Sequence, residues 1–205
     1  MTIGVDLDNT IICYDELFRV AALEQNLISP DVPATKKDVK LAVQASHGNN
    51  VWTHLQAAVY GPLLERALPY PGVVDFMQEC REDGMTVRVI SHKSQFPAVG
   101  ERFDLREAAL RWLALKGLMK DSSTGLSCYS VEFHDTRSAK VRAIGNWRCE
   151  VFVDDLAEVL TDEEFPAGTV PILFDPHQNH PNFGTLRQAQ CWKQIRQLIR
   201  NAKSA

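Results

Sequence analysis

Two pairs of aspartates carry the strongest chemical signal in the sequence. Asp6 and Asp8 are separated by one residue at the end of a short apolar run, and Asp154 and Asp155 directly follow another such run. Like charges this close repel one another, and a bound divalent cation together with a phosphate group would resolve the conflict. Mg²⁺ prefers carboxylate and water oxygens as ligands, whereas histidine and cysteine suit other metals. The two pairs therefore predict a magnesium site that handles a phosphate.

Phosphoryl transfer also needs hydrogen-bond donors and positive charge around the transferred group. Ser91 directly follows the apolar run that ends at Ile90, just as the aspartates follow their apolar runs, and its hydroxyl can donate a hydrogen bond. Lys140 lies at the start of a helical segment that precedes the second acidic pair, and Lys93 is the alternative source of the ammonium group. Four separate segments are thus expected to converge on one site.

Short apolar runs that alternate with helical patterns must position these residues. The alternation is typical of a parallel sheet whose strands are joined by crossover helices. The sequence predicts an α/β fold with a Rossmann-like open parallel sheet and helices on both faces, in which ligands bind at the carboxyl ends of the strands. The predicted strands are Thr2–Val5, Thr86–Ile90, Cys128–Phe133, Glu150–Val153 and Val170–Phe174.

Three helices are predicted in this α/β part of the chain from apolar residues at helical spacing. The first covers Val73–Arg81, with Gly84 as its terminator. The second begins after Asp104, which forms the pattern of a capping box with Glu107. The third covers Leu186–Ile199. Their apolar faces are interpreted as core packing and are assigned no chemistry.

The stretch between the first acidic pair and the first of these helices breaks the alternation. Apolar residues from Tyr14 to Tyr70 favour helices, with a proline-containing turn at residues 29–33, and Pro71-Gly72 marks the return to the α/β part. The predicted organisation is a catalytic core of residues 1–13 and 71–205 and a helical insertion of residues 14–70.

Composition limits the classes of function that fit the chain. The 205 residues are 45% hydrophobic and 23% charged, which suits one main globular core. A formal net charge of −4 gives no basic field, so neither a nucleic acid polymer nor an anionic membrane is expected as a partner. No leader peptide and no apolar stretch near the roughly 20 residues of a membrane span is found, which predicts a soluble protein. Five scattered cysteines indicate a reducing compartment, and the expected location is the cytoplasm.

The order of the motifs resembles the haloacid dehalogenase (HAD) superfamily. The resemblance rests on Asp-x-Asp-x-Thr at residues 6–10, Ser91 after the second core strand, a single lysine at position 140, and the pair at residues 154–155. It extends from Ile3 to Phe174. It implies a HAD-like core with a small helical cap of the C1 type, formed by the insertion.

The resemblance also implies a role for each residue of the motifs. Asp6 would attack phosphorus and form an aspartyl-phosphate, while Asp8 would protonate the leaving oxygen and later deprotonate water. Ser91 would hydrogen-bond the phosphoryl group, and Lys140 would neutralise charge on it and on the nucleophile. Thr10 would support the phosphate-binding loop.

Metal and substrate follow from the same resemblance. Mg²⁺ would be held by Asp6, the backbone carbonyl of Asp8, and Asp154 or Asp155. A carboxylate at position 8 favours a phosphate monoester of a small metabolite, because family members that cleave carbon–halogen or phosphonate bonds typically lack it. The cap would close over the site and select the leaving group. The candidate cap contacts are Arg19, Lys36, Lys37, Lys40 and His47.

Two other functions fit parts of this pattern. A phosphomutase or phosphotransferase of the same superfamily would use the same motifs and differ only in the acceptor of the phosphoryl group. A non-catalytic phospho-acceptor, as in receiver domains, also combines aspartates, a hydroxyl and a lysine, but it carries its phosphorylated aspartate on a middle strand. The substrate and the oligomeric state are not predicted by the sequence.

Overall fold

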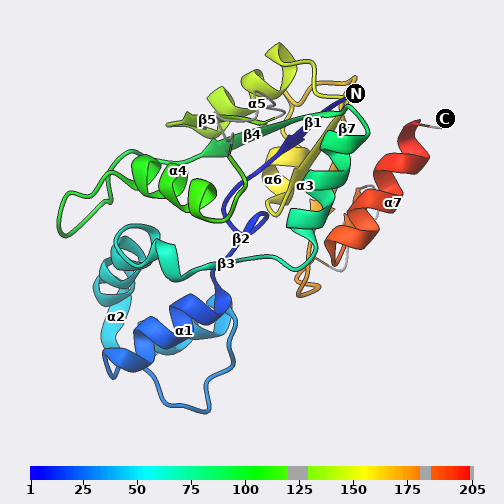
Figure 1. The fold of residues 1–205 in the computed structure, drawn as a ribbon. Coiled ribbons are helices and arrows are strands. Elements are labelled where there is room, and N and C mark those ends of the chain that lie inside the picture. The colour runs from blue at the N-terminus through cyan, green and yellow to red at the C-terminus, as the bar shows by residue number, and fades with distance from the viewer. Residues whose placement is uncertain (120–128, 181–185, 204–205) are drawn as a thin grey trace. The chain divides into compact units, whose positions relative to one another are not determined.

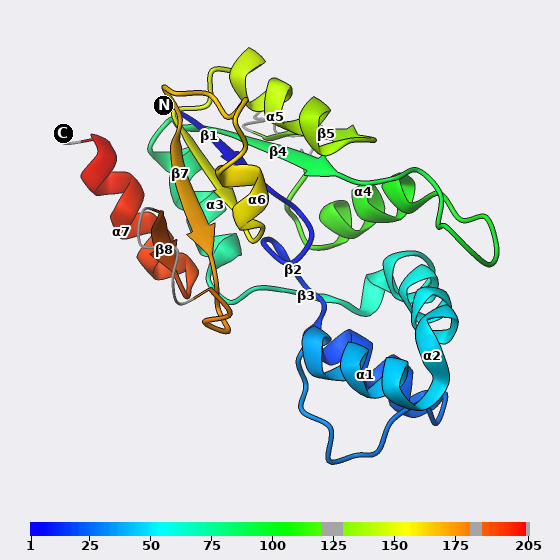
Figure 2. The same cartoon turned by 180° about the vertical axis from the view of Figure 1, so that it is seen from behind.

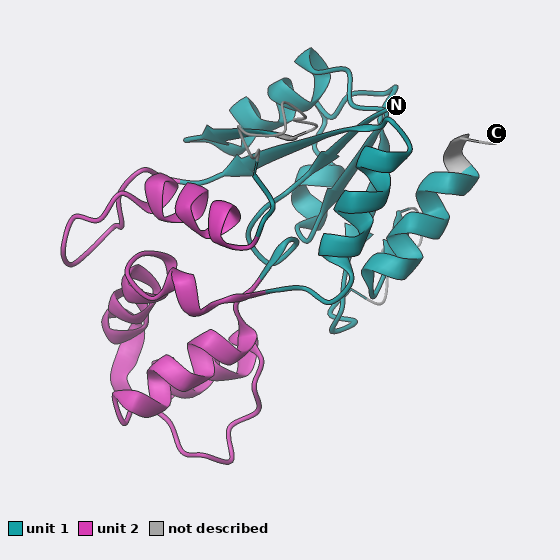
Figure 3. Cartoon of the chain, in the orientation of Figure 1, with its two compact units in different colours: residues 1–12, 69–93, 117–205 teal, residues 13–68, 94–116 magenta. Residues whose placement is uncertain are grey.

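The chain forms two compact units in the structure, a computed structural model that describes residues 1–119, 129–180 and 186–203 (Figures 1 and 3). Unit 1 comprises residues 1–12, 69–93 and 117–205, and unit 2 comprises residues 13–68 and 94–116. The chain leaves unit 1 through the short strand β2 (Ile12–Cys13) and returns through β3 (Leu68–Pro69).

Unit 1 is built on a six-stranded sheet in which all paired neighbours run parallel. The strand order is β5-β4-β1-β6-β7-β8, so the N-terminal strand lies at the centre between two strands from much later in the chain. This arrangement confirms the predicted Rossmann-like α/β fold. The strands are β1 (Thr2–Val5), β4 (Thr86–His92), β5 (Tyr129–His134), β6 (Val151–Asp154), β7 (Val170–Phe174) and β8 (Arg187–Ala189).

Helices cover both faces of this sheet (Figures 1 and 2). On one face, α5 (Arg137–Asn146) and α6 (Ala157–Leu160) bury apolar side chains in one cluster with Phe152 of β6. On the other face, α3 (Val73–Glu82) packs against α7 (Trp192–Lys203). The rings of Phe76 and Trp192 meet there at a centroid distance of 4.9 Å. Burial on both faces explains why β1 and β6 are mostly apolar up to the aspartates at their carboxyl ends.

The C-terminal part of unit 1 differs from the prediction of one helix from Leu186 to Ile199. Residues 187–189 form the edge strand β8, and α7 begins only at Trp192. The backbone N–H of Asp175 donates to the carbonyl of Ala189, which fixes this segment beside β7. Ala189 is buried as a residue of this strand, although its spacing from Trp192 would also suit a buried position on a helix. Of the predicted strand Cys128–Phe133, Cys128 lies outside the described residues.

Unit 2 is helical. Its elements are α1 (Asp15–Glu24), α2 (Lys36–Tyr60), the 3₁₀ helix η1 (Leu64–Arg66) and α4 (Leu105–Leu115). Gly48 has φ 82° and ψ 170°, a non-helical conformation that kinks α2 and divides it into two helical segments. The indole N–H of Trp112 donates to the carbonyl of Ala67 at 3.0 Å, so α4 groups with the inserted helices. The assignment of residues 14–70 as a cap stays a prediction.

The N-terminus of α4 is capped as its sequence indicates. The Asp104 carboxylate accepts hydrogen bonds from the backbone N–H groups of Arg106 and Glu107, so it caps α4 as predicted.

Throughout the part of the chain that the structure describes, every helix falls short of the length and apolarity needed to cross a membrane.

Candidate active site

The end of β1 places Asp6 at the carboxyl edge of the sheet. Its backbone N–H donates to the carbonyl of Val153 at 2.9 Å, which continues the β1–β6 pairing one residue beyond β1. The chain then turns sharply, because the N–H groups of Ile11 and Ile12 both donate to the carbonyl of Leu7 at 3.0 Å. Asn9 has φ 59°, a left-handed conformation that asparagine adopts more readily than most residues. Asp6 is held on a rigid strand end, with only 5% of its surface exposed.

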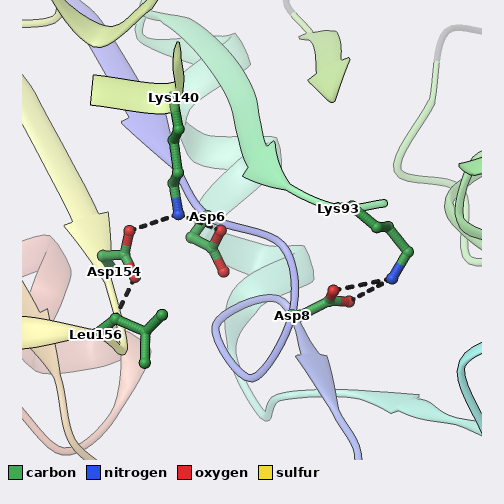
Figure 4. A network of polar contacts seen from close by, with 6 residues as sticks. All are labelled: Asp6, Asp8, Lys93, Lys140, Asp154 and Leu156. Atoms are coloured by element: carbon green, nitrogen blue, oxygen red, sulfur yellow. Dashed lines mark hydrogen bonds and ion pairs between the residues drawn. The ribbon is translucent and has the colours of Figure 1, made fainter. Parts of the chain in front are cut away.

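Lys140 bridges two carboxylates from separate strands (Figure 4). Its ammonium nitrogen lies 2.5 Å from Oδ1 of Asp6 and 2.6 Å from Oδ2 of Asp154. Thr136 caps α5 by accepting a hydrogen bond from the backbone N–H of Ala139, and this places Lys140 in the first turn of the helix. The lysine side chain is only 1% exposed, so its charge depends on these two partners.

The two carboxylates of the second acidic pair, Asp154 and Asp155, differ in their exposure to solvent. Asp154 is fully buried, and its Oδ1 accepts the backbone N–H of Leu156 at 2.9 Å while its Oδ2 faces Lys140. Asp155 is partly exposed. Oxygens of Asp6, Asp154 and Asp155 all lie within 4.8 Å of one another, a spacing that suits ligands of one cation. A hard, oxygen-only donor set of this kind fits Mg²⁺.

Burial and charge shift the titration of this cluster. The pKa of Asp6 is raised from 3.8 to about 7: burial is the largest cause, the charge of Lys140 opposes it, and the charges of Asp154 and Asp8 add to it. Burial alone would lower the pKa of Lys140, but the carboxylates of Asp154 and Asp6 outweigh it and raise that pKa above its ordinary value. Two carboxylates, Asp6 and Asp154, share the single ammonium group of Lys140, and the Asp155 carboxylate lies close to them, so the cluster carries excess negative charge. A proton or a cation can compensate the excess negative charge.

Two hydroxyl groups beside the acidic strand ends are buried without a protein partner. The Oγ of Ser91 and the Oγ1 of Thr10 make no hydrogen bond within the described residues, although both side chains are 0% exposed. Such groups are costly to bury, so two hydroxyls without a partner among the described residues are consistent with a ligand that they bind. The indole of Trp192 donates to the backbone carbonyl of Thr10 at 3.2 Å, which holds the loop in place.

Asp8 pairs with a different lysine. The ammonium group of Lys93 lies 3.0 Å from Oδ1 and 2.8 Å from Oδ2 of Asp8. The sequence leaves Lys93 and Lys140 as alternatives for one position beside the nucleophile. The structure gives each of them its own aspartate, and Lys140 is the one that contacts Asp6. This second ion pair has no signal in the sequence, because residues 8 and 93 are related only by the neighbouring positions of β1 and β4.

The five candidate cap residues lie in unit 2. Arg19 donates to the backbone carbonyls of Pro30 and Val32 at 2.8 and 3.1 Å, which occupies its guanidinium in holding a loop. Lys36 lies over the rings of Phe18 and Tyr60, 5.9 and 5.5 Å from their centroids. The predicted contacts of these five residues with a substrate stay predictions. The other three candidates are exposed: Lys37, Lys40 and His47.

Similar folds occur among known structures. The sequence matches no protein-family model and no curated protein. YfnB of Bacillus subtilis, described as a HAD-hydrolase and solved with bound magnesium, is 14% identical with a TM-score of 0.59, and the match covers 97% of each chain. A HAD hydrolase of family IA from Entamoeba histolytica is 10% identical with a TM-score of 0.58, covering 98% of this chain and 99% of its own. A phosphoserine phosphohydrolase-like protein from Francisella tularensis is 15% identical with a TM-score of 0.51, covering 97% and 99%. The chain has the fold of the HAD-superfamily hydrolases.

Proposed function

We propose that this protein is a Mg²⁺-dependent phosphohydrolase that cleaves the phosphate monoester of a small metabolite through an aspartyl-phosphate on Asp6. One observation carries the proposal: Lys140 bridges Asp6 and Asp154 at the carboxyl edge of a parallel sheet, with an oxygen of Asp155 within cation-sharing distance. The hydroxyl of Ser91, which has no hydrogen-bond partner among the described residues, adds a donor for the phosphoryl group. The fold shared with HAD-superfamily hydrolases supports the same reaction class.

In the first step, a carboxylate oxygen of Asp6 attacks phosphorus. The Oδ–P bond forms as the ester P–O bond breaks, and Asp8 donates its proton to the leaving oxygen. Ser91 donates a hydrogen bond to the phosphoryl oxygens, and Lys140 offsets the negative charge that accumulates on them. The substrate leaves as an alcohol, and the phosphoryl group stays on the protein.

In the second step, water replaces the aspartate. Asp8, now a carboxylate, takes a proton from water, whose oxygen attacks phosphorus. The Oδ–P bond breaks, and the products are inorganic phosphate, a free Asp6 carboxylate and a protonated Asp8. One acid/base group thus serves both steps and returns to its starting state.

The acidic cluster would hold the cation that this chemistry needs. Asp6 and Asp155 have carboxylate oxygens in reach, and Asp154 is within the same radius but already bonded to Leu156 and Lys140. A bound Mg²⁺ supplies positive charge that screens the nucleophile from the phosphate and stabilises the transition state. It would also replace the proton on Asp6, because the pKa of that carboxyl group is raised in a cluster with excess negative charge.

A panel of small phosphate monoesters assayed with Mg²⁺ and with a chelator tests the proposal. We expect phosphate release that requires the cation and is lost in Asp6→Asn. Asp75→Asn, an exposed aspartate in the first turn of α3, is the matched control and should retain full activity. Trapping ³²P-labelled protein in Asp8→Asn would support the covalent intermediate. Full turnover by the Asp6 variant would refute the mechanism.

A further inference from the structure

Unit 1 contains a second buried lysine that the proposed reaction does not use. The side chain of Lys93 is only 4% exposed, and its ammonium group contacts both carboxylate oxygens of Asp8, at 3.0 and 2.8 Å. Figure 4 shows the Asp8 carboxylate directed away from Asp6 and toward Lys93. The nucleophile and the acid/base therefore have separate lysine partners, Lys140 and Lys93.

The backbone holds both ends of this ion pair in place. Along the end of β4, the buried Ser91 and Lys93 alternate with the exposed His92, as expected for a strand that extends past its last assigned residue. The backbone N–H of Lys93 donates to the carbonyl of His134 at 3.0 Å, which continues the β4–β5 pairing. On the other side, Asp8 forms an isolated bridge with Ile12. The pair thus joins two rigid stretches of backbone.

An ammonium nitrogen at nearly equal distances from both carboxylate oxygens lies close to the extension of the Cβ–Cγ bond of the aspartate. It therefore holds the direction in which the Asp8 side chain points, while the plane of the carboxyl group can still turn. General acid–base catalysis requires the carboxylate to face the leaving oxygen, and small displacements of a reacting group cost rate. The ammonium group is costly to bury without a partner, so it stays beside the Asp8 side chain in the folded protein. It can donate to the carboxylate and also to the carbonyl oxygen of the carboxylic acid while Asp8 carries the proton.

We propose that Lys93 is a positioning residue for Asp8: it sets the direction of the side-chain carboxyl group that, as the acid, protonates the leaving oxygen and then, as the carboxylate, takes a proton from water. The inference rests on the proposed phosphohydrolase function and adds to it a residue outside the four motifs. Lys93 acts through Asp8 and makes no bond to the substrate. Replacing Lys93 should therefore change kcat/KM for different leaving groups in the same way as replacing Asp8 does.

Leaving groups of different basicity separate this role from a general effect on the site. The ratio kcat/KM reports the step that releases the leaving group, and an aryl phosphate with an acidic phenol needs little protonation in that step, whereas an alkyl phosphate needs it fully. We expect Lys93→Met to lower kcat/KM by about 10- to 100-fold for the alkyl phosphate and by less than about 3-fold for the aryl phosphate. Lys93→Arg, which keeps the charge and two donors, should recover part of the loss.

A double-mutant cycle with Asp8→Asn provides the second readout. Measured as the single-turnover rate of alcohol release from the alkyl phosphate, the step in which Asp8 is the acid, Lys93→Met should add no further loss in the Asp8→Asn background. Lys193→Met, at an exposed position on α7, is the matched control and should behave like the unmodified protein. Urea unfolding of each variant checks that the fold is retained.

The possible outcomes distinguish failure of this inference from failure of the proposed function. An equal loss of kcat/KM with both substrates, or a full additional loss in the Asp8→Asn background, would show that Lys93 binds the phosphoryl group or supports the fold, and the inference would be wrong. Normal activity of Lys93→Met in an active enzyme would overturn the inference alone. An unmodified protein with no phosphatase activity would overturn the proposed function, and this positioning role with it.

Discussion

Replacing Asp6 with Asn should stabilise the protein at neutral pH when no divalent cation is present. The pKa of Asp6 is raised from 3.8 to about 7, chiefly by burial. A carboxyl group with a raised pKa binds its proton more tightly in the folded chain than in the unfolded chain. Its stabilising contribution is therefore complete below about pH 3.8 and is lost as the pH rises through about 7.

The size of the effect follows from that shift. The difference between 7 and 3.8 is about 3 pKa units, and at 1.36 kcal/mol per unit the full loss is about 4 kcal/mol, of which about 3 kcal/mol falls between pH 5 and pH 8. Asparagine is neutral at every pH and keeps a side-chain oxygen that can accept from Lys140. The variant should therefore lack this pH dependence.

Urea unfolding of both proteins in the presence of a chelator, at several pH values from 5 to 8, measures the effect. The free energy of unfolding of Asp6→Asn should exceed that of the unmodified protein by an amount that grows with pH. Saturating Mg²⁺ should reverse the order at pH 8, because the cation binds the carboxylate and not the amide. Asp75→Asn should follow the unmodified protein throughout. A stability difference that does not change with pH would refute the reasoning about the Asp6 cluster.

Three further predictions follow from single contacts. Asp155→Asn should weaken Mg²⁺ binding by at least about 10-fold in titration calorimetry with little change in metal-free stability. Asp154→Ala, by contrast, removes the acceptor of both Lys140 and the Leu156 N–H and should lower the free energy of unfolding by about 3 kcal/mol; equal effects of the two would contradict this division. Ser91→Ala should lower kcat/KM on the order of 10²-fold while changing stability by less than about 0.5 kcal/mol, since its hydroxyl has no partner in the described residues; a large loss of stability in urea unfolding would argue against a ligand-binding hydroxyl. Gly4→Ala should destabilise the protein by about 1–3 kcal/mol, because a Cβ at this position would overlap the ring of Phe152; an unchanged urea midpoint would show that the core can adjust.

The central part of the fold is readable from the sequence because its signals are local. Buried strands appear as short apolar runs, and the strands Thr2–Val5 and Val170–Phe174 have the predicted bounds. Asp6 and Asp154 follow directly from this pattern, since each stands where a predicted strand ends. Lys140, predicted from its place before the second acidic pair, contacts both of them.

Features that depend on tertiary pairing are not readable in this way. The strand β8 has three residues, and Ala189 has the spacing of a helical residue relative to Trp192, so only its hydrogen bond beside β7 reveals a strand. The grouping of α4 with the inserted helices depends on the bond from Trp112 to Ala67, which joins residues 45 positions apart. The pair of Asp8 and Lys93 spans 85 positions. In each case the deciding contact is distant in sequence and leaves no local pattern.

The central position of β1 has a consequence for the order in which the molecule is assembled. This strand precedes both of its partners along the chain and pairs with strands that begin at Thr86 and Val151, so during synthesis its apolar side chains stay unpaired until those later strands are made. Pairings of such long sequence separation are slow to form, and an unpaired apolar strand invites association with other chains in the meantime. The helices of residues 13–68, by contrast, make neighbouring contacts and can form before the sheet closes. Recovery after dilution from denaturant should therefore be limited by insertion of β1 between β4 and β6.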